Sequence, residues 1–136
     1  MNRFYKLVII TFCCLLVAGA ILAGSTVIFY NRPRDCDTSQ VLFARSTTVE
    51  NNIASLRLSV DKDGYYYHSY KLSYRVNDDG VLYAYLTMRG CYADHFAVES
   101  DADGYFDLEI PIREGTARLI LQGENSQKTI WIAPED

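Results

Sequence analysis

The feature that most restricts this chain is an unbroken apolar run near its N-terminus. Residues 7–30 read LVIITFCCLLVAGAILAGSTVIFY, 24 positions without a charged side chain. A bilayer core about 30 Å thick is crossed by roughly 20 apolar residues, and at ~1.5 Å per residue this run reaches about 36 Å. A chain of 136 residues has no interior that could enclose such a helix on every face. The run therefore predicts a transmembrane helix at 7–30, preceded by a short tail at 1–6.

A cleaved signal peptide is the second interpretation of this run. Small residues at 18–20 and 22–24 resemble a cleavage site. The apolar part of a signal peptide usually measures only about 7–15 residues, however, and this run is longer. We therefore expect an uncleaved signal-anchor that crosses the cell membrane once.

The charges that flank the run do not set its orientation. Arg3 and Lys6 precede it, Arg32 and Arg34 follow it, and the two pairs balance under the positive-inside rule. A short tail before the first apolar run normally stays inside while the longer part is exported. We expect a cytoplasmic N-terminus and an extracytoplasmic C-terminal domain.

The remainder of the chain is acidic and globular in composition. Residues 35–136 carry 9 Lys and Arg against 17 Asp and Glu, a net charge of −8. Nucleic-acid binding needs clustered cations, so this balance argues against a nucleic-acid partner. Apolar residues make up 49% of the chain and charged residues 22%, which excludes a disordered chain.

Alternation of apolar and polar residues predicts an all-β domain at 49–136, after a juxtamembrane linker at 31–48. Strands are expected at 41–44, 53–60, 65–76, 81–88, 105–112, 117–122 and 129–133. The turns between them contain Asp-Gly or Glu-Gly pairs, as at 77–80 and 113–116. The segment 89–104 has no clear period. This pattern predicts a small antiparallel sandwich or barrel, immunoglobulin-like in size.

The strand at 105–112 alternates most regularly. Its outward positions include Asp107 and Glu109. Its inward positions are Phe106, Leu108, Ile110 and Ile112. We expect these to be buried together with either Trp131 or the pair Ile130 and Ile132.

Four cysteines are present, and two of them lie inside the apolar run. Cys13 and Cys14 are expected to pack in the membrane as small apolar residues. Cys36 and Cys91 remain, and they permit one disulfide. By closing a long loop, this disulfide would stabilise the fold by about 3–4 kcal/mol. It would require an oxidising compartment. Two buried free thiols are the alternative. No Cys or His spacing matches a zinc site.

Nine tyrosines lie between positions 65 and 105. Tyrosine favours strands and carries an apolar ring with a polar tip, so cross-strand packing explains most of them. The alternative is an exposed aromatic patch that binds a partner or a sugar. The candidates for that patch are Tyr65, Tyr67, Tyr83, Tyr85 and Tyr105.

Catalytic signatures are missing from the sequence. No GxSxG, HExxH, GxGxxG or P-loop occurs, and the two histidines, His68 and His95, lack a motif around them. The acidic turns fail the calcium-loop pattern, since Gly104 comes at the fourth position after Asp101 where a sixth is required. We expect a protein that has no catalytic activity and that uses no metal, cofactor or small-molecule substrate.

A Tyr-rich strand followed by Asp79-Gly80-Val81-Leu82-Tyr83 and Thr129-Ile130-Trp131 resembles small membrane-anchored proteins of Gram-positive bacteria with no established role. The resemblance covers about the last 85 residues and implies a surface-exposed domain without activity. We expect a non-catalytic protein-binding or accessory module whose partner is another membrane or surface protein. The alternatives are an immunity-type or structural surface protein, and an enzyme or carbohydrate-binding module.

Overall fold

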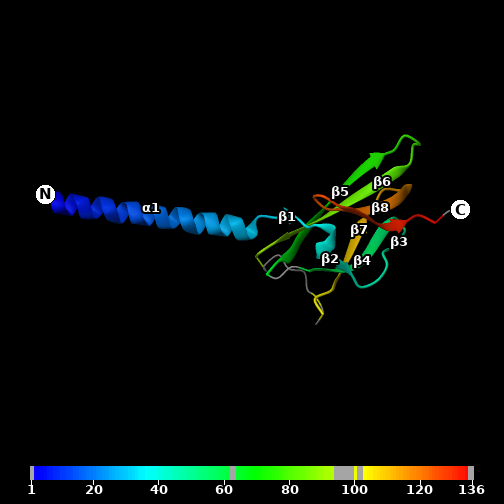
Figure 1. Ribbon diagram of the computed structural model, residues 1–136, viewed down its shortest axis with the longest axis horizontal. Helices are drawn as coiled ribbons and strands as arrows, with labels where there is room; N and C mark the ends of the chain where they lie inside the picture. Colours follow the sequence, from blue (N-terminus) through cyan, green and yellow to red (C-terminus); the bar gives the residue numbers. More distant parts are fainter. Residues whose placement is uncertain (1, 62–63, 94–99, 101–102, 135–136) are drawn as a thin grey trace. The chain divides into compact units, whose positions relative to one another are not determined.

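The computed structural model describes residues 2–61, 64–93, 100 and 103–134. The chain divides into two compact units, Met1–Arg32 and Pro33–Asp136. The first unit holds one helix and the second holds nine strands in two sheets (Figure 1). The prediction of a β-sandwich behind one N-terminal helix is confirmed.

Helix α1 (Arg3–Asn31) contains the whole apolar run. Asn2 caps its start by accepting a hydrogen bond from the Phe4 backbone N–H at 3.2 Å. The helix ends at Asn31 because Arg32, which precedes Pro33, takes an extended conformation. The helix has 29 residues and is long and apolar enough to cross a membrane. Arg3 and Lys6 belong to the helix rather than to a separate tail.

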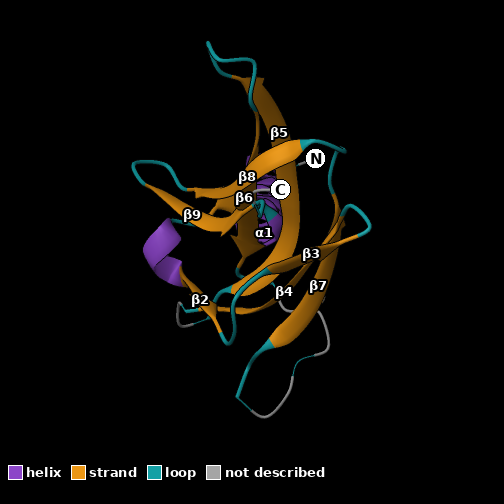
Figure 2. Cartoon of the chain, turned by 90° about the vertical axis from the view of Figure 1, so that its right-hand side faces the viewer, coloured by secondary structure: helices purple, strands orange, loops and turns teal. Residues whose placement is uncertain are grey.

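The domain is built from two sheets that face each other. Sheet A contains β1 (Arg34–Asp35), β5 (Tyr66–Val76), β6 (Leu82–Cys91), β8 (Thr116–Gln122) and β9 (Gln127–Ile132). Sheet B contains β2 (Val41–Phe43), β3 (Thr48–Glu50), β4 (Ile53–Val60) and β7 (Phe106–Pro111). A 3-10 turn, η1 (Thr38–Gln40), joins β1 of sheet A to β2 of sheet B. Figure 2 shows the two layers, with β5 and β7 on one side and β9 and β2 on the other.

Strand pairing is antiparallel at every described ladder except one. β6 and β8 run parallel, with Tyr83 beside Arg118 and Tyr85 beside Ile120. The chain leaves sheet A after β6, forms β7 in sheet B and returns as β8, so the connection between these neighbours is a crossover. The antiparallel pairing expected from the sequence therefore fails at this ladder.

The segment 31–48 is not a linker after Pro33. β1 pairs with the end of β6, placing Arg34 opposite Gly90. β2 pairs with β4, and β3 begins at Thr48 as part of a hairpin with β4. The hairpin turns at Asn51 and Asn52, whose φ angles of 52° and 61° suit a tight turn between strands. Of these short strands, β1 belongs to sheet A, and β2 and β3 belong to sheet B.

One apolar core lies between the sheets. β4 contributes Leu56 and Leu58, which are 1% and 0% exposed, and β6 contributes Leu86 and Met88, both 0% exposed. Leu119 and Leu121 of β8 complete its centre. Burial of one face from each sheet supplies most of the stabilisation of a sandwich.

The alternation predicted for 105–112 is confirmed. Asp107 and Glu109 are exposed. The inward side chains Phe106, Ile110 and Ile112 are buried, and Leu108 is half-buried against the core. On β9, both Trp131 and Ile130 pack on the core, whereas Ile132 is 59% exposed. A bulge in the β8–β9 ladder explains why two consecutive residues reach the same side.

Side-chain hydrogen bonds connect the two sheets on one side of the sandwich. On the β2–β9 side, the Ser126 hydroxyl donates to the Asp37 carboxylate at 2.6 Å and lies 2.6 Å from the Thr38 hydroxyl. The Asp37 carboxylate and the Gln40 side chain also cap η1. The hydrogen bond from Ser126 is the main reason that the pKa of Asp37 lies below 3.8. Side-chain hydrogen bonds thus tie η1 to the β8–β9 turn.

We expect burial to grade the cost of truncation along β7. Ile110→Ala should lower the free energy of unfolding by about 2–5 kcal/mol, because it removes a fully buried side chain. Leu108→Ala on the same face should cost less, because Leu108 is only half-buried. Denaturant unfolding of the detergent-solubilised chain, followed by fluorescence of its single tryptophan, Trp131, measures both. Equal losses would contradict the position of β7 in the core.

Candidate binding face

The outer face of sheet A carries two half-exposed tyrosines at its centre. Tyr83 and Tyr85 lie on β6 and point away from the core, since Ala84 between them is 0% exposed. β5 places Arg75 opposite Tyr83, and β8 places Arg118 beside Tyr83 and Ile120 beside Tyr85. Three strands therefore contribute to one continuous surface.

Arginines hold both rings in place. The guanidinium of Arg75 lies 5.2 Å from the ring centroid of Tyr85, and that of Arg118 lies 5.7 Å from the ring centroid of Tyr83. Both distances are within the range of a cation–π interaction. The Asn77 amide also donates to the Tyr83 hydroxyl at 3.1 Å. The rings lose little freedom when a partner binds because they are ordered already.

The turn after β5 determines which residues of β5 and β6 lie opposite each other. The Asn77 N–H donates to the Val81 carbonyl at 3.0 Å, and Gly80 closes the turn with a φ of 76° that favours glycine. The Asn77 side chain accepts from the Val81 N–H at 2.8 Å. This confirms the predicted turn at 77–80 and fixes Arg75 against Tyr83.

Charge on this face has the opposite sign to that of the whole domain. The described outward residues of β1, β5, β6, β8 and β9 include one carboxylate, Asp35, which pairs with Arg89 at 3.3 Å. Lys71, Arg75 and Arg118 share the face. We call Lys71, Arg75, Tyr83, Tyr85 and Arg118 the basic aromatic face. It concentrates positive charge on a domain with a net charge of −8 over residues 35–136.

The structure assigns the five tyrosines proposed from the sequence to different places. Tyr83 and Tyr85 lie together on the basic aromatic face. Tyr105 is half-buried and directly precedes β7, on the other sheet. Tyr65 and Tyr67 are buried, with 6% and 9% exposed, so their predicted outward position is wrong.

A bulge in β5 is the reason for this error. The ladder shifts between Tyr67 and Ser69, so His68 is the extra residue. The shift lets Tyr67 and Tyr70 both face the core, although an unbroken strand would place them on opposite faces. The Tyr67 ring packs on Phe106 at a centroid distance of 5.0 Å. Burial raises the pKa of Tyr67 to about 12.

Tyr65 packs beside the end of β6. Its ring lies 5.0 Å from that of Tyr92 and covers Gly90, where an added Cβ would collide with the Tyr65 ring and lie 2.9 Å from the Tyr66 carbonyl oxygen. Burial is the main cause that raises the pKa of Tyr65 to about 12, and neighbouring Cys36 adds to it. Glycine at position 90 is therefore required by the packing of Tyr65.

The disulfide between Cys36 and Cys91 is not formed in the structure, where both residues are buried thiols. The Cys36 N–H donates to the Met88 carbonyl, which places Cys36 opposite Met88. Cys91 lies three residues beyond Met88 on β6, which is about 10 Å along the strand at ~3.3 Å per residue. A disulfide needs Cα atoms within about 7 Å, so the strand register separates the two thiols. Cys13 and Cys14 are also thiols.

The described residues do not assemble a catalytic or metal-binding group. His68 Nδ1 lies 2.8 Å from the hydroxyl of its neighbour Ser69, at the bulge. His95 lies outside the described residues. Within the described ranges, no three His, Cys, Asp or Glu side chains gather as metal ligands. These positions therefore supply no argument for catalysis.

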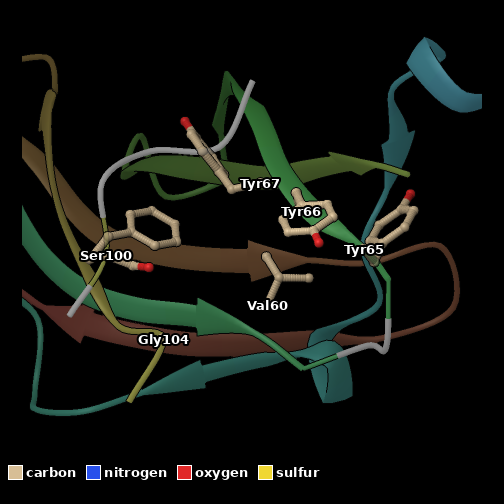
Figure 3. Close-up of a pocket in the computed structure, with 7 residues that line it drawn as sticks. Val60, Tyr65, Tyr66, Tyr67, Ser100 and Gly104 are labelled. Atoms are coloured by element: carbon tan, nitrogen blue, oxygen red, sulfur yellow. The ribbon is translucent and has the colours of Figure 1, made fainter. Parts of the chain in front are cut away.

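A small cavity opens beside the buried tyrosines (Figure 3). Val60 and the start of β5 line it together with Ser100 and Gly104. Its volume is about 210 Å³, below the roughly 300–1,000 Å³ of typical ligand pockets. The cavity gives no support to a small-molecule site.

Comparison with known proteins returns no relative: no family model, no curated protein and no solved structure matches this chain. The resemblance to membrane-anchored proteins of Gram-positive bacteria therefore stays a prediction.

Sequence reasoning found two of the five residues of the basic aromatic face. Lys71 and Arg75 fall within the strand expected at 65–76, where they had no assigned role. Arg118 could not be connected to Tyr83, because the parallel pairing of β6 with β8 has no local signal. The outward alternation of Lys71, Ser73 and Arg75 was the signal that could have identified the face.

The buried tyrosines predict a loss of stability in alkali. Tyrosine in the unfolded chain ionises near pH 10.0, whereas Tyr67 in the fold ionises near 12, so stability should fall as the pH rises from 10 to 12. Tyr67→Phe should flatten this fall, because phenylalanine has no proton to lose. Tyr66→Phe is the control, because the Tyr66 ring is 39% exposed. Unfolding midpoints against pH, followed by Trp131 fluorescence, measure the slope, and identical slopes for all three chains would refute the assignment.

Proposed function

We propose that this chain is a single-pass membrane protein whose β-domain lies outside the cytoplasm and binds an acidic surface of another protein. The basic aromatic face is the observation that supports the proposal. Tyrosine and arginine are enriched where proteins bind each other, because each combines a large contact area with hydrogen-bonding groups. The proposal includes no catalytic step.

The sign of the charge indicates the kind of partner. Lys71, Arg75 and Arg118 lie on the face without an ion pair among the described residues. A partner with exposed Asp or Glu would gain both attraction and faster association, whereas a basic partner would be repelled. Sheet B instead carries exposed carboxylates, Glu50, Asp107 and Glu109, of which Asp107 pairs with Arg45 and Arg57. The domain is therefore polarised, and its basic side is the binding side.

Site-specific photo-crosslinking in intact membranes tests this proposal. Benzoylphenylalanine in place of Tyr85 should give a discrete adduct whose mass differs from twice that of the chain. The same group in place of Ser55, on β4 of sheet B, is the matched control and should give none. Arg75→Glu with Arg118→Glu should lower the Tyr85 adduct by about tenfold, because like charges then face each other. Equal adducts from Tyr85 and Ser55, or insensitivity to charge reversal, would refute it.

Orientation is tested separately. A reporter that folds only after export should be active when fused after Asp136, and a reporter that works only in the cytoplasm should be inactive there. The reverse result would place the domain inside the cell.

A further inference from the structure

We infer that two copies of this chain pair through the open side of the sandwich, with β5 of each copy beside β7 of the other. This inference concerns self-association. It uses Lys71, which also belongs to the basic aromatic face, and its tests detect the dimer rather than the other partner. The open side is the one where the edge strands β5 and β7 lie together (Figure 2).

The free edge of β5 is long and regular. The Asn77 N–H bonds to the Val81 carbonyl, and in an antiparallel ladder every second residue forms backbone hydrogen bonds to the same neighbour. Arg75, Ser73 and Lys71 are therefore the residues that bond to β6. The residues between them direct their backbone N–H and C=O groups away from β6, namely Tyr70, Leu72, Tyr74 and Val76. In the part of the chain that the structure describes, β5 pairs with β6 alone.

The edges of the domain differ in what limits their pairing with another strand. β2 and β3 have three residues each, and β9 is bulged against β8. β7 carries outward carboxylates and Pro111. Native proteins use short strands, bulges, charges and proline in this way to prevent edge pairing. The bulge of β5 lies at its start, and residues 70–76 continue without proline or a further shift. The edge of β5 is limited by its cations, and that of β7 by its carboxylates and one proline near its end, so each edge disfavours a strand of like charge rather than the other edge.

Charge excludes the simplest dimer, in which like edges pair. Two β5 strands paired antiparallel about Ser73 would set Lys71 against Arg75, and two β7 strands would set Asp107 against Glu109. Like charges directly opposite each other destabilise a sheet. The crossed arrangement instead places one cation of β5, Lys71, beside one carboxylate of β7, Glu109.

The register of the two edges fits the crossed arrangement. Within one copy β5 and β7 advance together, since Tyr67 packs on Phe106 and the Tyr74 hydroxyl accepts from the Arg113 N–H at 3.1 Å. Counting along both strands from Tyr67 and Phe106, and leaving out the bulged residue His68, we place Lys71 at the level of Glu109. A two-fold axis parallel to the strands preserves these levels and pairs β5 with β7 of the second copy in parallel.

The backbone groups of Glu109 match those of β5 in this register. The Ile112 N–H donates to the Asn52 carbonyl at 2.8 Å, and alternation from that bond directs the N–H and C=O of Glu109 away from β4. In a parallel ladder such a residue bonds to the two residues that flank its level on the neighbouring strand. For Glu109 of the second copy, those residues are Tyr70 and Leu72, whose groups point outward.

The membrane anchor favours the same axis. The chain enters the domain at Arg34, opposite Gly90, at the end of sheet A where β5 starts and β6 finishes. An axis parallel to the strands leaves both entry points at one end, as two anchors in one membrane require. Antiparallel pairing of like edges would send them to opposite ends.

Disulfide trapping in membranes tests the arrangement. Both chains carry Cys13→Ser and Cys14→Ser, and two differently tagged forms carry Lys71→Cys or Glu109→Cys. A heterodimer linked between positions 71 and 109 is the expected product after mild oxidation. A dominant 71–71 link would show like-edge pairing, and no link at either pair would show no edge contact; both results overturn the inference.

Charge reversal supplies the matched control with all other contacts kept. Lys71→Glu or Glu109→Lys alone should lower the dimer fraction of the full chain in nanodiscs by about two- to fivefold, counted by native mass spectrometry. The two changes in one chain should restore it, because each pair is then reversed and opposite again. A dimer held by α1 alone would ignore all three variants and would also overturn the inference.

Discussion

Sheet A depends on β6, because this strand is paired along both of its edges. β5 covers one edge, while β8 and β1 divide the other between them. Its inward residues Ala84, Leu86 and Met88 are 0% exposed, so the strand that connects the backbone ladders also occupies the centre of the core. The backbone that carries its outward residues is therefore fixed by hydrogen bonds on both sides. Tyr83 and Tyr85 are held at the middle of a sheet whose neighbours bring arginines from distant parts of the chain.

Much of this architecture could be predicted from local pattern. The strands β4 and β7 each bury one face. In such strands, apolar residues at every second position identify the side chains that point inward. Turns with glycine in a left-handed conformation, such as the one that ends at Gly80, mark hairpins without knowledge of the rest of the fold. The apolar run of α1 has the same property, because bilayer thickness alone sets the length of a spanning helix.

What could not be predicted depends on pairing between distant segments. The bulge at His68 has no residue signature, yet it moves Tyr67 into the core and removes it from the expected surface. β1 has two residues, too few to show a period, and its pairing with β6 decides that Cys36 faces Met88 rather than Cys91. The basic aromatic face requires the parallel neighbour β8. Each of these features follows from register, which short-range sequence patterns do not specify.

The order of strands along the chain also governs when the domain can close during synthesis. Three hairpins, β3–β4, β5–β6 and β8–β9, join neighbours in sequence and need little loop closure. The first strand, β1, must instead wait for β6, and the last two strands complete the sheet that it begins. A nascent chain that ends before Thr116 exposes one edge of β6 and the apolar residues beneath it. Translation to the last strands is therefore a condition for folding, and a chain terminated earlier would consist of the apolar helix and hairpins that lack their neighbours and are prone to aggregate.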